Sequence, residues 1–273
     1  MASPSGVLLV IATSSAGMVV ASTQSLHRCA MMPRIGSLEI APGKLASLNV
    51  GEELCLFRAR SGGHSFSAKR IAQRPHAFLL SGVLTYAECD YLMAQAALRG
   101  MHSAETTGRT DNRKHCDVCT LRPADSPMLE ALTADICECL LTEGARGPGG
   151  GCEDLHLLRY APGGEFKLHF DATPGSTRAL TVLYYLNGCG ATWFPLGNCE
   201  REPDGPEEMN LWLEQRSPPD DGLQVAGKRG DALAFYHYAE DGNLDLLALH
   251  AGLPAPATRW VGSHFIHVGR QGS

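Results

Sequence analysis

The hydrophobic pattern divides the chain into a helix-containing part and a longer part rich in strands. Apolar residues recur at helical spacing in two stretches. The first follows Thr85, with Glu88 three residues later, a capping box that marks a helix start, and it stops at Gly100. The second opens with Ser126-Pro127, and proline is favoured at the first helical position. The expected apolar stripes are Cys89, Leu92, Met93 and Ala96 in the first helix, and Met128, Leu129, Leu132, Ile136 and Leu140 in the second.

Short apolar runs bounded by turn residues make up the rest of the pattern. One run precedes the first helix, at residues 71–84, and the others follow the second helix from Glu153 onward. Short runs separated by turn signals are typical of strands in a sandwich or barrel. The later runs cover residues 155–159, 160–171, 178–186, 190–195, 232–236, 249–254 and 259–267. The pattern therefore predicts a mainly β protein with flanking helices, and it fits a jelly-roll barrel.

Length and composition suit one large domain with short extensions, because 273 residues with 44% hydrophobic content can bury a sizeable core. We expect this domain at residues 71–273, a leader of uncertain structure at 26–70, and a polar surface insertion at 196–222. Residues 1–25 carry an apolar run, which favours a signal or targeting segment, although no Lys or Arg precedes it. We therefore expect the secretory pathway, in the endoplasmic reticulum or Golgi; the alternatives for residues 1–25 are a weak membrane anchor and a disordered start.

The charges argue against a nucleic-acid partner. The net charge is −6 and no basic run occurs, whereas nucleic-acid binding usually needs clustered Lys and Arg. The oligomeric state stays open at this level.

Cysteine spacing gives only a weak indication of a zinc or redox site. Cys116 and Cys119 have the spacing of zinc or redox pairs, but no second pair follows, so a disulfide or plain thiols are favoured. Cys137 and Cys139 lie two residues apart in a predicted helix, where side chains face apart, and we do not expect them to pair with each other.

A metal site is suggested by His169 and Asp171, which are two residues apart in an expected strand. Side chains at positions i and i+2 of a strand point to the same face, so both can reach one ion. One imidazole and one carboxylate are two of the three ligands of the 2-His-1-carboxylate triad, which leaves open positions on a non-haem Fe(II). His250 is the candidate for the third ligand. The alternatives are a chance His-x-Asp and a core histidine.

Several motifs in the same order make the chain resemble the prolyl 4-hydroxylases of the plant and algal type, a branch of the 2-oxoglutarate- and Fe(II)-dependent dioxygenases. The resemblance runs from about Arg74 to Val268. The motifs are Tyr160–Asp171, Gly190–Pro195, Gly230–Tyr236, Leu249–Pro254 and Arg259–His267. The resemblance implies a double-stranded β-helix and, as iron ligands, His169, Asp171 and His250. It also implies formation of 4-hydroxyproline from peptidyl proline, with 2-oxoglutarate decarboxylated to succinate and CO2, O2 as oxidant, and ascorbate (vitamin C) as a cofactor.

The resemblance further implies a site for the distal carboxylate of 2-oxoglutarate. The family places a Lys before a Trp, whereas this chain has Arg259-Trp260, with one residue fewer after the third His. Arg preserves the positive charge and can bind a carboxylate through two parallel hydrogen bonds. Tyr160 and Thr192 match the family's supporting hydroxyl groups; the alternative for Tyr160 is an ordinary half-buried aromatic residue.

The resemblance assigns six further positions to a proline-rich peptide or protein substrate. They are Glu153, Phe166, Arg178, Phe265, His267 and Arg113. Phe166 stands where the family has Tyr, and Phe265 where it has Trp. Arg113, in a polar stretch expected as a loop, falls near an Arg-x-Ser whose Ser is missing here. The same chemistry on another peptide residue, a free amino acid or a small metabolite stays open, as does a non-catalytic metal-binding barrel.

Overall fold

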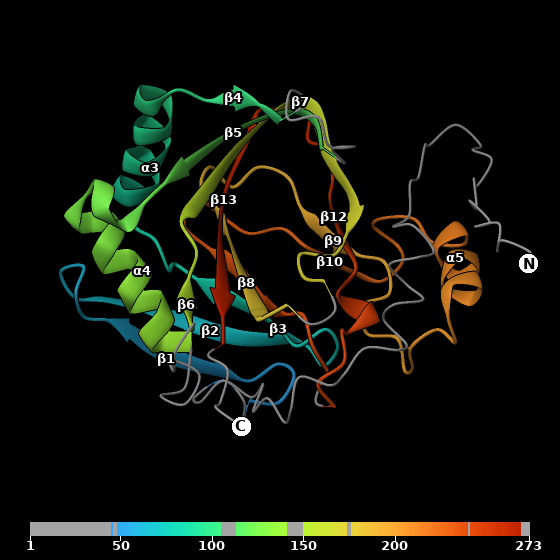
Figure 1. Cartoon of the computed structure of the whole chain (residues 1–273). Helices are drawn as coiled ribbons and strands as arrows, with labels where there is room; N and C mark the ends of the chain where they lie inside the picture. Colours follow the sequence, from blue (N-terminus) through green and yellow to red (C-terminus); the bar gives the residue numbers. More distant parts are fainter. Residues whose placement is uncertain are drawn as a thin grey trace, which may run out of the picture.

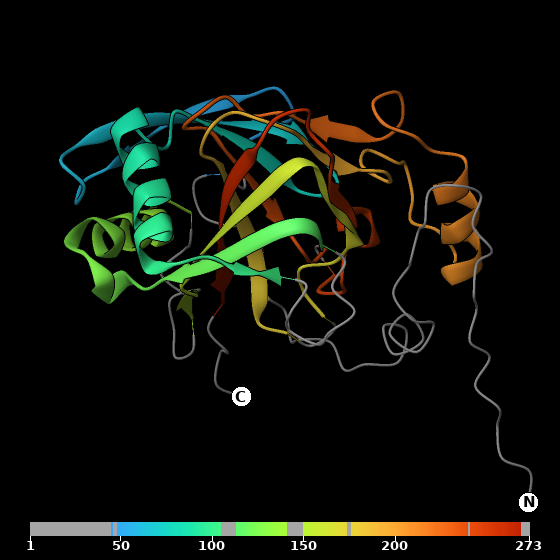
Figure 2. The same ribbon diagram turned by 90° about the horizontal axis from the view of Figure 1, so that it is seen from above.

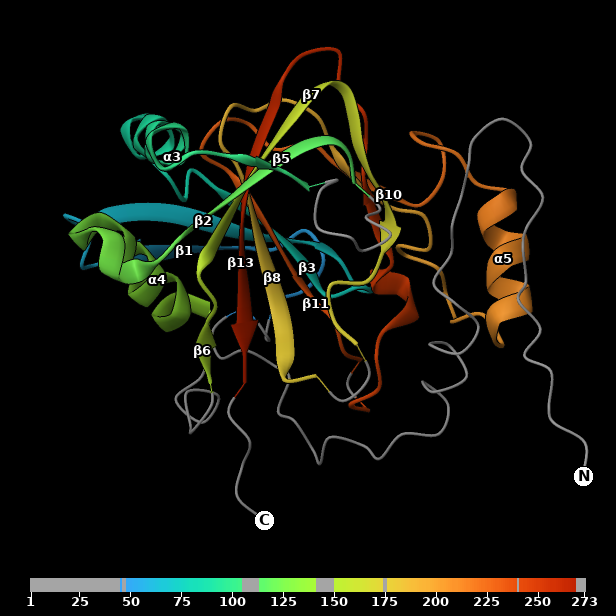
Figure 3. The same cartoon turned by 45° about the horizontal axis from the view of Figure 1, so that its top comes forward.

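Antiparallel pairing joins the strands into one sheet that curls into a barrel (Figures 1 and 3). In the computed structural model, the described residues are 45, 48–104, 113–140, 150–173, 176–239 and 241–268. Within them the sheet has 13 strands in the order β1-β2-β3-β11-β8-β13-β7-β12-β9-β10, with β5 on β7 and β4, and β6 on β13. The strands are β1 Glu53–Arg58, β2 His64–Ala72, β3 Ala77–Ser81, β4 His102–Ser103, β5 Arg113–Leu121, β6 Gly151–Cys152, β7 Leu155–His169, β8 Arg178–Tyr185, β9 Thr192–Phe194, β10 Leu223–Val225, β11 Ala232–Tyr236, β12 His250–Gly252 and β13 Arg259–His267.

This arrangement is the expected mainly β, double-stranded β-helix fold with flanking helices. The helices are α3 Tyr86–Arg99, α4 Pro127–Leu140 and α5 Pro206–Glu214, with short 3-10 turns at Pro123–Asp125 and Leu246–Ala248. Figure 2 shows α3 and α4 at one flank of the barrel and α5 at the opposite end. No helix among the described residues has the length and apolar character needed to cross a membrane.

Both predicted helices are confirmed. Thr85 caps α3 and forms the expected capping box with Glu88. The inward faces of the helices are buried and pack against the sheet, with Cys89, Leu92 and Ala96 from α3 and Leu129, Leu132, Ile136 and Leu140 from α4 in the main core cluster. The hydrophobic stripes therefore bind the helices to the barrel.

Strand β7 carries Tyr160 near its middle and His169 at its end, two of the residues expected at the site. It is 15 residues long; on one edge it pairs with β5 from Leu155 to Phe166, and on the other its first part pairs with β13 and its last part with β12. Gly163 lies in the left-handed region at φ 75°, and a Cβ on Gly164 would come within 2.8 Å of the carbonyl oxygen of Ala161. Only glycine suits these adjacent requirements, so the two glycines let the strand turn from one set of partners to the other.

Three expectations need correction. The boundary expected at residue 71 falls inside β2, because residues from the leader 26–70 already form the β1–β2 hairpin on the sheet edge. The insertion 196–222 contains a helix, α5, that buries Met209 and Leu213, so it is not purely a polar surface excursion. Arg113 begins strand β5 and is not in a loop. The targeting segment expected at residues 1–25 lies outside the described residues.

The cysteines separate by environment. Cys116 and Cys119 are three residues apart on β5, so they face opposite sides of the sheet and lie in different core clusters. Cys137 does not pair with Cys139, as expected; it forms a disulfide with Cys152, which joins α4 to β6.

Candidate active site

The predicted metal ligands meet where β7 and β12 lie side by side. His169 ends β7 and is the register partner of His250, the first residue of β12. Asp171 follows two residues after His169, and its Oδ1 lies 3.4 Å from His169 Nε2 while its Oδ2 lies 3.5 Å from His250 Nε2. The ligand atoms of the three residues all lie within 4.8 Å of one another. This spacing fits three ligands on one side of a single metal ion.

Each imidazole is oriented so that Nε2 faces the common centre. Nδ1 of His169 donates to the carbonyl oxygen of Lys167 at 2.7 Å, and Nδ1 of His250 donates to that of Ala248 at 3.0 Å. Backbone hydrogen bonds of this kind fix the tautomer of a metal-binding histidine. Aromatic rings pack against the imidazoles. Phe166 stacks on His169 with 3.5 Å between the ring centres, and the ring centre of Phe235 lies 4.7 Å from that of His250.

The local electrostatics keep the ligands in the protonation states that a metal ion needs. Burial, assisted by the neighbouring His169, lowers the pKa of His250 to about 3. Burial alone would raise the pKa of Asp171, but His250 and His169 outweigh it and hold that pKa well below its usual range. The site therefore offers a neutral His250 imidazole and an ionised Asp171 carboxylate at neutral pH.

A buried cation lies farther along the same strands. Arg259 opens β13 and is the register partner of Tyr160 on β7, and Thr192 on β9 pairs with Gly252 on β12. The guanidinium Nη2 lies 3.4 Å from Thr192 Oγ1, and the side chain is only 2% exposed. Its Nε meets no hydrogen-bond acceptor among the described residues. A buried guanidinium with an unused N–H is suited to a carboxylate ligand.

Two hydroxyl groups accompany this guanidinium. Burial raises the pKa of Tyr160 well above its usual range, so its hydroxyl stays protonated and can donate. Arg259 lies 5.7 Å from the centre of the Tyr160 ring. Thr192 is held by the hydroxyl of Tyr185, which lies 3.3 Å from Thr192 Oγ1. The expected trio of Tyr160, Thr192 and Arg259 therefore comes together.

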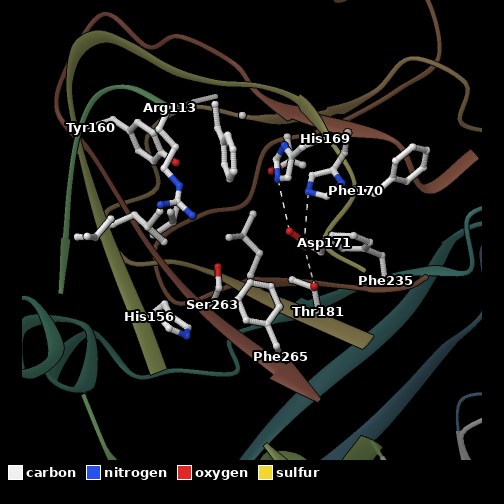
Figure 4. A pocket seen from close by; sticks show the side chains of 18 of the residues that line it. Arg113, His156, Tyr160, His169, Phe170, Asp171, Thr181, Phe235, Ser263 and Phe265 are labelled. Atoms are coloured by element: carbon white, nitrogen blue, oxygen red, sulfur yellow. Dashed lines mark hydrogen bonds and ion pairs between the residues drawn. The ribbon is translucent and has the colours of Figure 1, made fainter. Parts of the chain in front are cut away.

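One pocket of about 480 Å³ contains both groups of residues. Figure 4 shows His169 and Asp171 at one side, Tyr160 and Arg113 at the other, and Phe265, Ser263 and His156 toward a third. Of the twelve residues expected at the site, all except His267 line this pocket. The lining thus places the metal ligands and a buried cation in a single cavity. It also includes a more exposed polar side, formed by Glu153, His156 and Arg178 and called the mouth. Substrate pockets typically have a few convergent polar groups of this kind.

The residues expected at the substrate gather around Glu153. Arg178 and His267 each approach Glu153 Oε1 to 2.6 Å. Burial acts to raise the pKa of Glu153, but these two partners lower it on balance. Arg178 also lies 3.9 Å from the centre of the Phe265 ring. His267 reaches the pocket only through Glu153.

Phe166 and Arg113 form a separate pair. The guanidinium of Arg113 lies 4.8 Å from the centre of the Phe166 ring, which also stacks on His169. The two residues come together because Arg113 on β5 is the register partner of Phe166 on β7.

Sequence reasoning missed Thr181, His237 and His156. Thr181 donates to Asp171 Oδ2 at 2.7 Å and lies 2.9 Å from His237 Nε2. His156 lies 3.3 Å from Thr120 at the pocket mouth. The signal for Thr181 was the one threonine in the otherwise apolar and aromatic run Ala179–Leu186, and that for His237 was a histidine directly after the apolar strand β11.

The amino-acid sequence is similar to those of known oxygenases. Residues 155–267 match the family model described as the 2OG-Fe(II) oxygenase superfamily. The chain is 29% identical over 223 residues to prolyl 4-hydroxylase 2 of Arabidopsis thaliana, covering 73% of this chain and 70% of the relative. It is 27% identical over 219 residues to probable prolyl 4-hydroxylase 4 of the same plant, with the same coverage of 73% and 70%.

The fold is also similar to a solved structure. The 2OG complex of a viral collagen prolyl hydroxylase from Paramecium bursaria Chlorella virus-1 superposes with a TM-score of 0.52 at 20% identity. The superposition covers 73% of this chain and 99% of the viral one.

Proposed function

We propose that the chain is a prolyl 4-hydroxylase-type 2-oxoglutarate-dependent dioxygenase of the 2OG-Fe(II) oxygenase superfamily. In this proposal it hydroxylates peptidyl proline to 4-hydroxyproline while 2-oxoglutarate is converted to succinate and CO2. The observation that carries the proposal is the single pocket that contains the His169, Asp171 and His250 cluster together with the buried Arg259. The relatives named prolyl 4-hydroxylase support the choice of proline.

The residues fit Fe(II) and 2-oxoglutarate. His169, Asp171 and His250 would hold the iron, since two imidazoles and a carboxylate on one side of an ion are the donor set of non-haem Fe(II) oxygenases. Arg259, with its unused Nε and the nearby hydroxyl groups of Tyr160 and Thr192, would hold the distal carboxylate. When bound, iron, 2-oxoglutarate and O2 supply the oxidising power for C–H hydroxylation. The further requirement for ascorbate is part of the proposal.

The protein's own contribution is binding, orientation and exclusion of water. Phe166 and Phe235 cover the two imidazoles, and the apolar Leu158, Leu183 and Val261 also line the pocket. An extended proline-rich peptide presents flat, preorganised rings, and aromatic-lined grooves bind such rings well. Phe265, braced by Arg178, offers one such ring at the mouth.

We assign the polar mouth to the peptide backbone. Arg178 lines the pocket and has N–H groups beyond those bonded to Glu153 and Asp171. His267 contributes by holding Glu153 Oε1, and Arg113 lies over Phe166. These groups are partly buried, so hydrogen bonds to peptide carbonyl groups there would be stronger than at an open surface. The partner we propose is therefore a proline-rich peptide or protein.

A second candidate keeps the chemistry and changes the substrate to another peptide residue, a free amino acid or a small metabolite. The observation that favours it is Phe166 and Phe265 in the pocket lining, since neither ring carries a hydrogen-bond donor. A non-catalytic barrel is disfavoured, because the metal ligands and the buried Arg259 are all present.

We also propose that the protein works in the secretory pathway. The Cys137–Cys152 disulfide supports this compartment, because disulfides persist in oxidising compartments and are rare in the cytosol. A full-length fluorescent fusion that stays in the cytosol would contradict this assignment.

Succinate formation by the purified full chain with Fe(II), 2-oxoglutarate and ascorbate tests the activity, with and without a poly-proline peptide. We expect the peptide to stimulate succinate formation and to gain one oxygen atom on proline, seen by mass spectrometry. Asp171→Ala is the matched control and should abolish both signals. Succinate formation that the peptide leaves unchanged would discard proline as the substrate, and an active Asp171→Ala would refute the metal site.

A further inference from the structure

Asp171 is held by side chains that are not metal ligands themselves. These side chains support an inference that rests on the proposed function. Thr181 Oγ1 lies 2.7 Å from Asp171 Oδ2 and 2.9 Å from Nε2 of His237. Both Thr181 and His237 are 2% exposed. Thr181 lines the pocket and His237 does not. His237 therefore lies behind Thr181 as seen from the pocket, and the Thr181 hydroxyl connects it to Asp171.

Strand register explains why the three residues meet. Thr181 on β8 is the partner of Phe235 on β11, and the backbone N–H of His237, just past the end of β11, donates to the carbonyl of Ala179 at 3.0 Å. Phe235 and His237 are two residues apart, so their side chains point to the same face, toward the metal ligands. The contact thus follows from the pairing of β8 with β11, which joins segments far apart in sequence.

The direction of the hydrogen bonds follows from the donor inventory. An ionised carboxylate only accepts, so the single hydroxyl proton of Thr181 goes to Asp171 Oδ2. Thr181 must then accept from His237, which places a proton on His237 Nε2. A neutral ring supplies this proton, because burial lowers the pKa of His237 to about 4.

We infer that His237 is a positioning residue which, through Thr181, engages one oxygen of Asp171 so that the carboxylate offers the metal only the other oxygen. Oδ2 takes the Thr181 hydrogen bond, which occupies one of its lone pairs, and lies 3.5 Å from Nε2 of His250, while Oδ1 lies 3.4 Å from Nε2 of His169. The backbone of Asp171 is fixed as well, because Arg178 Nη1 donates to its carbonyl oxygen at 2.7 Å. The Thr181 hydrogen bond therefore restricts rotation of the carboxylate, and the Arg178 hydrogen bond restricts movement of the backbone that carries it.

The consequence concerns the number of open positions on the metal. A carboxylate that binds with both oxygens occupies one more position than a carboxylate that binds with one. 2-Oxoglutarate needs two positions and O2 needs another, so a one-oxygen Asp171 leaves room for both. Outer hydrogen bonds to ligating carboxylates typically change metal affinity or activity 10–100-fold, about the effect we expect here.

Anaerobic titration of the metal-free full chain with Fe(II), with and without 2-oxoglutarate, tests the inference. Thr181→Val removes both hydrogen bonds of the Thr181 hydroxyl, and His237→Leu removes the one between His237 and Thr181. We expect Fe(II) to bind about 10–100-fold more weakly to both variants. His237→Gln can restore a donor through its amide and should bind Fe(II) close to the wild-type affinity. The absorption spectrum of Co(II) in the site, which reports coordination number, should change in the Leu and Val variants and not in the Gln variant.

His264→Leu is the matched control. His264 is also buried, with its ring nitrogens near Tyr184 and Thr133, and it does not line the pocket. This variant should lower the melting temperature while leaving Fe(II) affinity unchanged. Unaltered Fe(II) affinity and Co(II) spectra in Thr181→Val and His237→Leu would overturn the inference. So would a His237→Gln variant that behaves like His237→Leu, since the ring would then act by packing alone. A wild-type protein that binds Fe(II) without hydroxylating the prolyl peptide would contradict only the proposed substrate.

Discussion

At the scale of single residues, the space around Arg259 is defined by glycines. A Cβ on Gly190 would come within 2.6 Å of Arg259 Cδ, and a Cβ on Gly252 would come within 2.9 Å of Arg259 Nη1. The guanidinium therefore reaches its position next to Thr192 only because side chains are absent on two neighbouring segments. Arg in place of Lys preserves the charge, and these glycines accommodate its broader, planar head.

The first prediction follows from this packing. Gly190→Ala should displace Arg259 and raise the KM for 2-oxoglutarate about tenfold, the equivalent of about 1.4 kcal/mol of binding free energy. Fe(II) affinity should stay unchanged, because the metal ligands are not touched. Initial rates of succinate formation at varied 2-oxoglutarate measure the KM.

The control separates backbone strain from side-chain collision. Gly82 has φ 69°, close to the 80° of Gly190, but a Cβ there meets no atom within 4 Å. Gly82→Ala should therefore cost stability without changing the KM for 2-oxoglutarate. An equal rise in KM in both variants would show that general strain, and not displacement of Arg259, is responsible.

The residues of the site differ in whether the sequence alone can predict them. His169 and Asp171 could be paired from spacing, because two positions on one strand share a face whatever the rest of the fold does. His237 and Thr181 could not, because their meeting depends on the pairing of β8 with β11. Local patterns carry no information on which distant strands become neighbours.

At the scale of elements, α5 supports the metal ligands from outside the barrel. Its Met209 and Leu213 belong to a buried cluster with Leu168, the residue before His169, and Leu249, the residue before His250. Figure 2 shows α5 at the end of the barrel away from α3 and α4. The segment expected to be a polar excursion thus packs behind both histidine-bearing strands.

Leu213→Ala tests this support. The change opens a cavity in a buried cluster, so we expect a loss of about 2–4 kcal/mol in the free energy of unfolding and weaker Fe(II) binding. Leu211→Ala is the control on the same helix, because Leu211 is 55% exposed, and it should change stability by less than about 0.5 kcal/mol. Urea unfolding and Fe(II) titration measure the two effects. Equal stability of the two variants would mean that α5 is only loosely attached.

Elements differed in how well sequence predicted them. Helices α3 and α4 were found because end signals and a stripe of apolar residues agree over 14 residues each. Strand β12 spans only three residues, and it was located through the motif around His250. The β1–β2 hairpin was not predicted because its signal is weak. In β2 the buried Phe66 and Ala68 alternate with polar residues, and in β1 only the short run Leu54–Phe57 is apolar.

At the scale of the whole molecule, the barrel and one flanking helix are joined covalently beside the substrate side of the pocket. The Cys137–Cys152 disulfide joins α4 to β6, β6 pairs with the end of β13 that carries His267, and Glu153 directly follows Cys152. The bond therefore fixes the strand that precedes Glu153, the residue on which Arg178 and His267 converge. This pairing could not be foreseen, because it joins a helix to a strand across a connection whose path is not encoded in cysteine spacing.

The last prediction concerns this bond. The disulfide joins residues 15 apart in sequence, for which loop closure predicts about 3 kcal/mol of stabilisation. The double variant Cys137→Ser/Cys152→Ser should lose about this amount and should no longer respond to a reductant, whereas Cys55→Ser, at an exposed thiol on β1, should respond as the wild type does. Peptide mapping without reduction should find Cys137 linked to Cys152 in protein taken from an oxidising compartment. If that link is missing there, or if a reductant destabilises the double variant as much as the wild type, the bond does not stabilise the fold and the argument for an oxidising compartment fails with it.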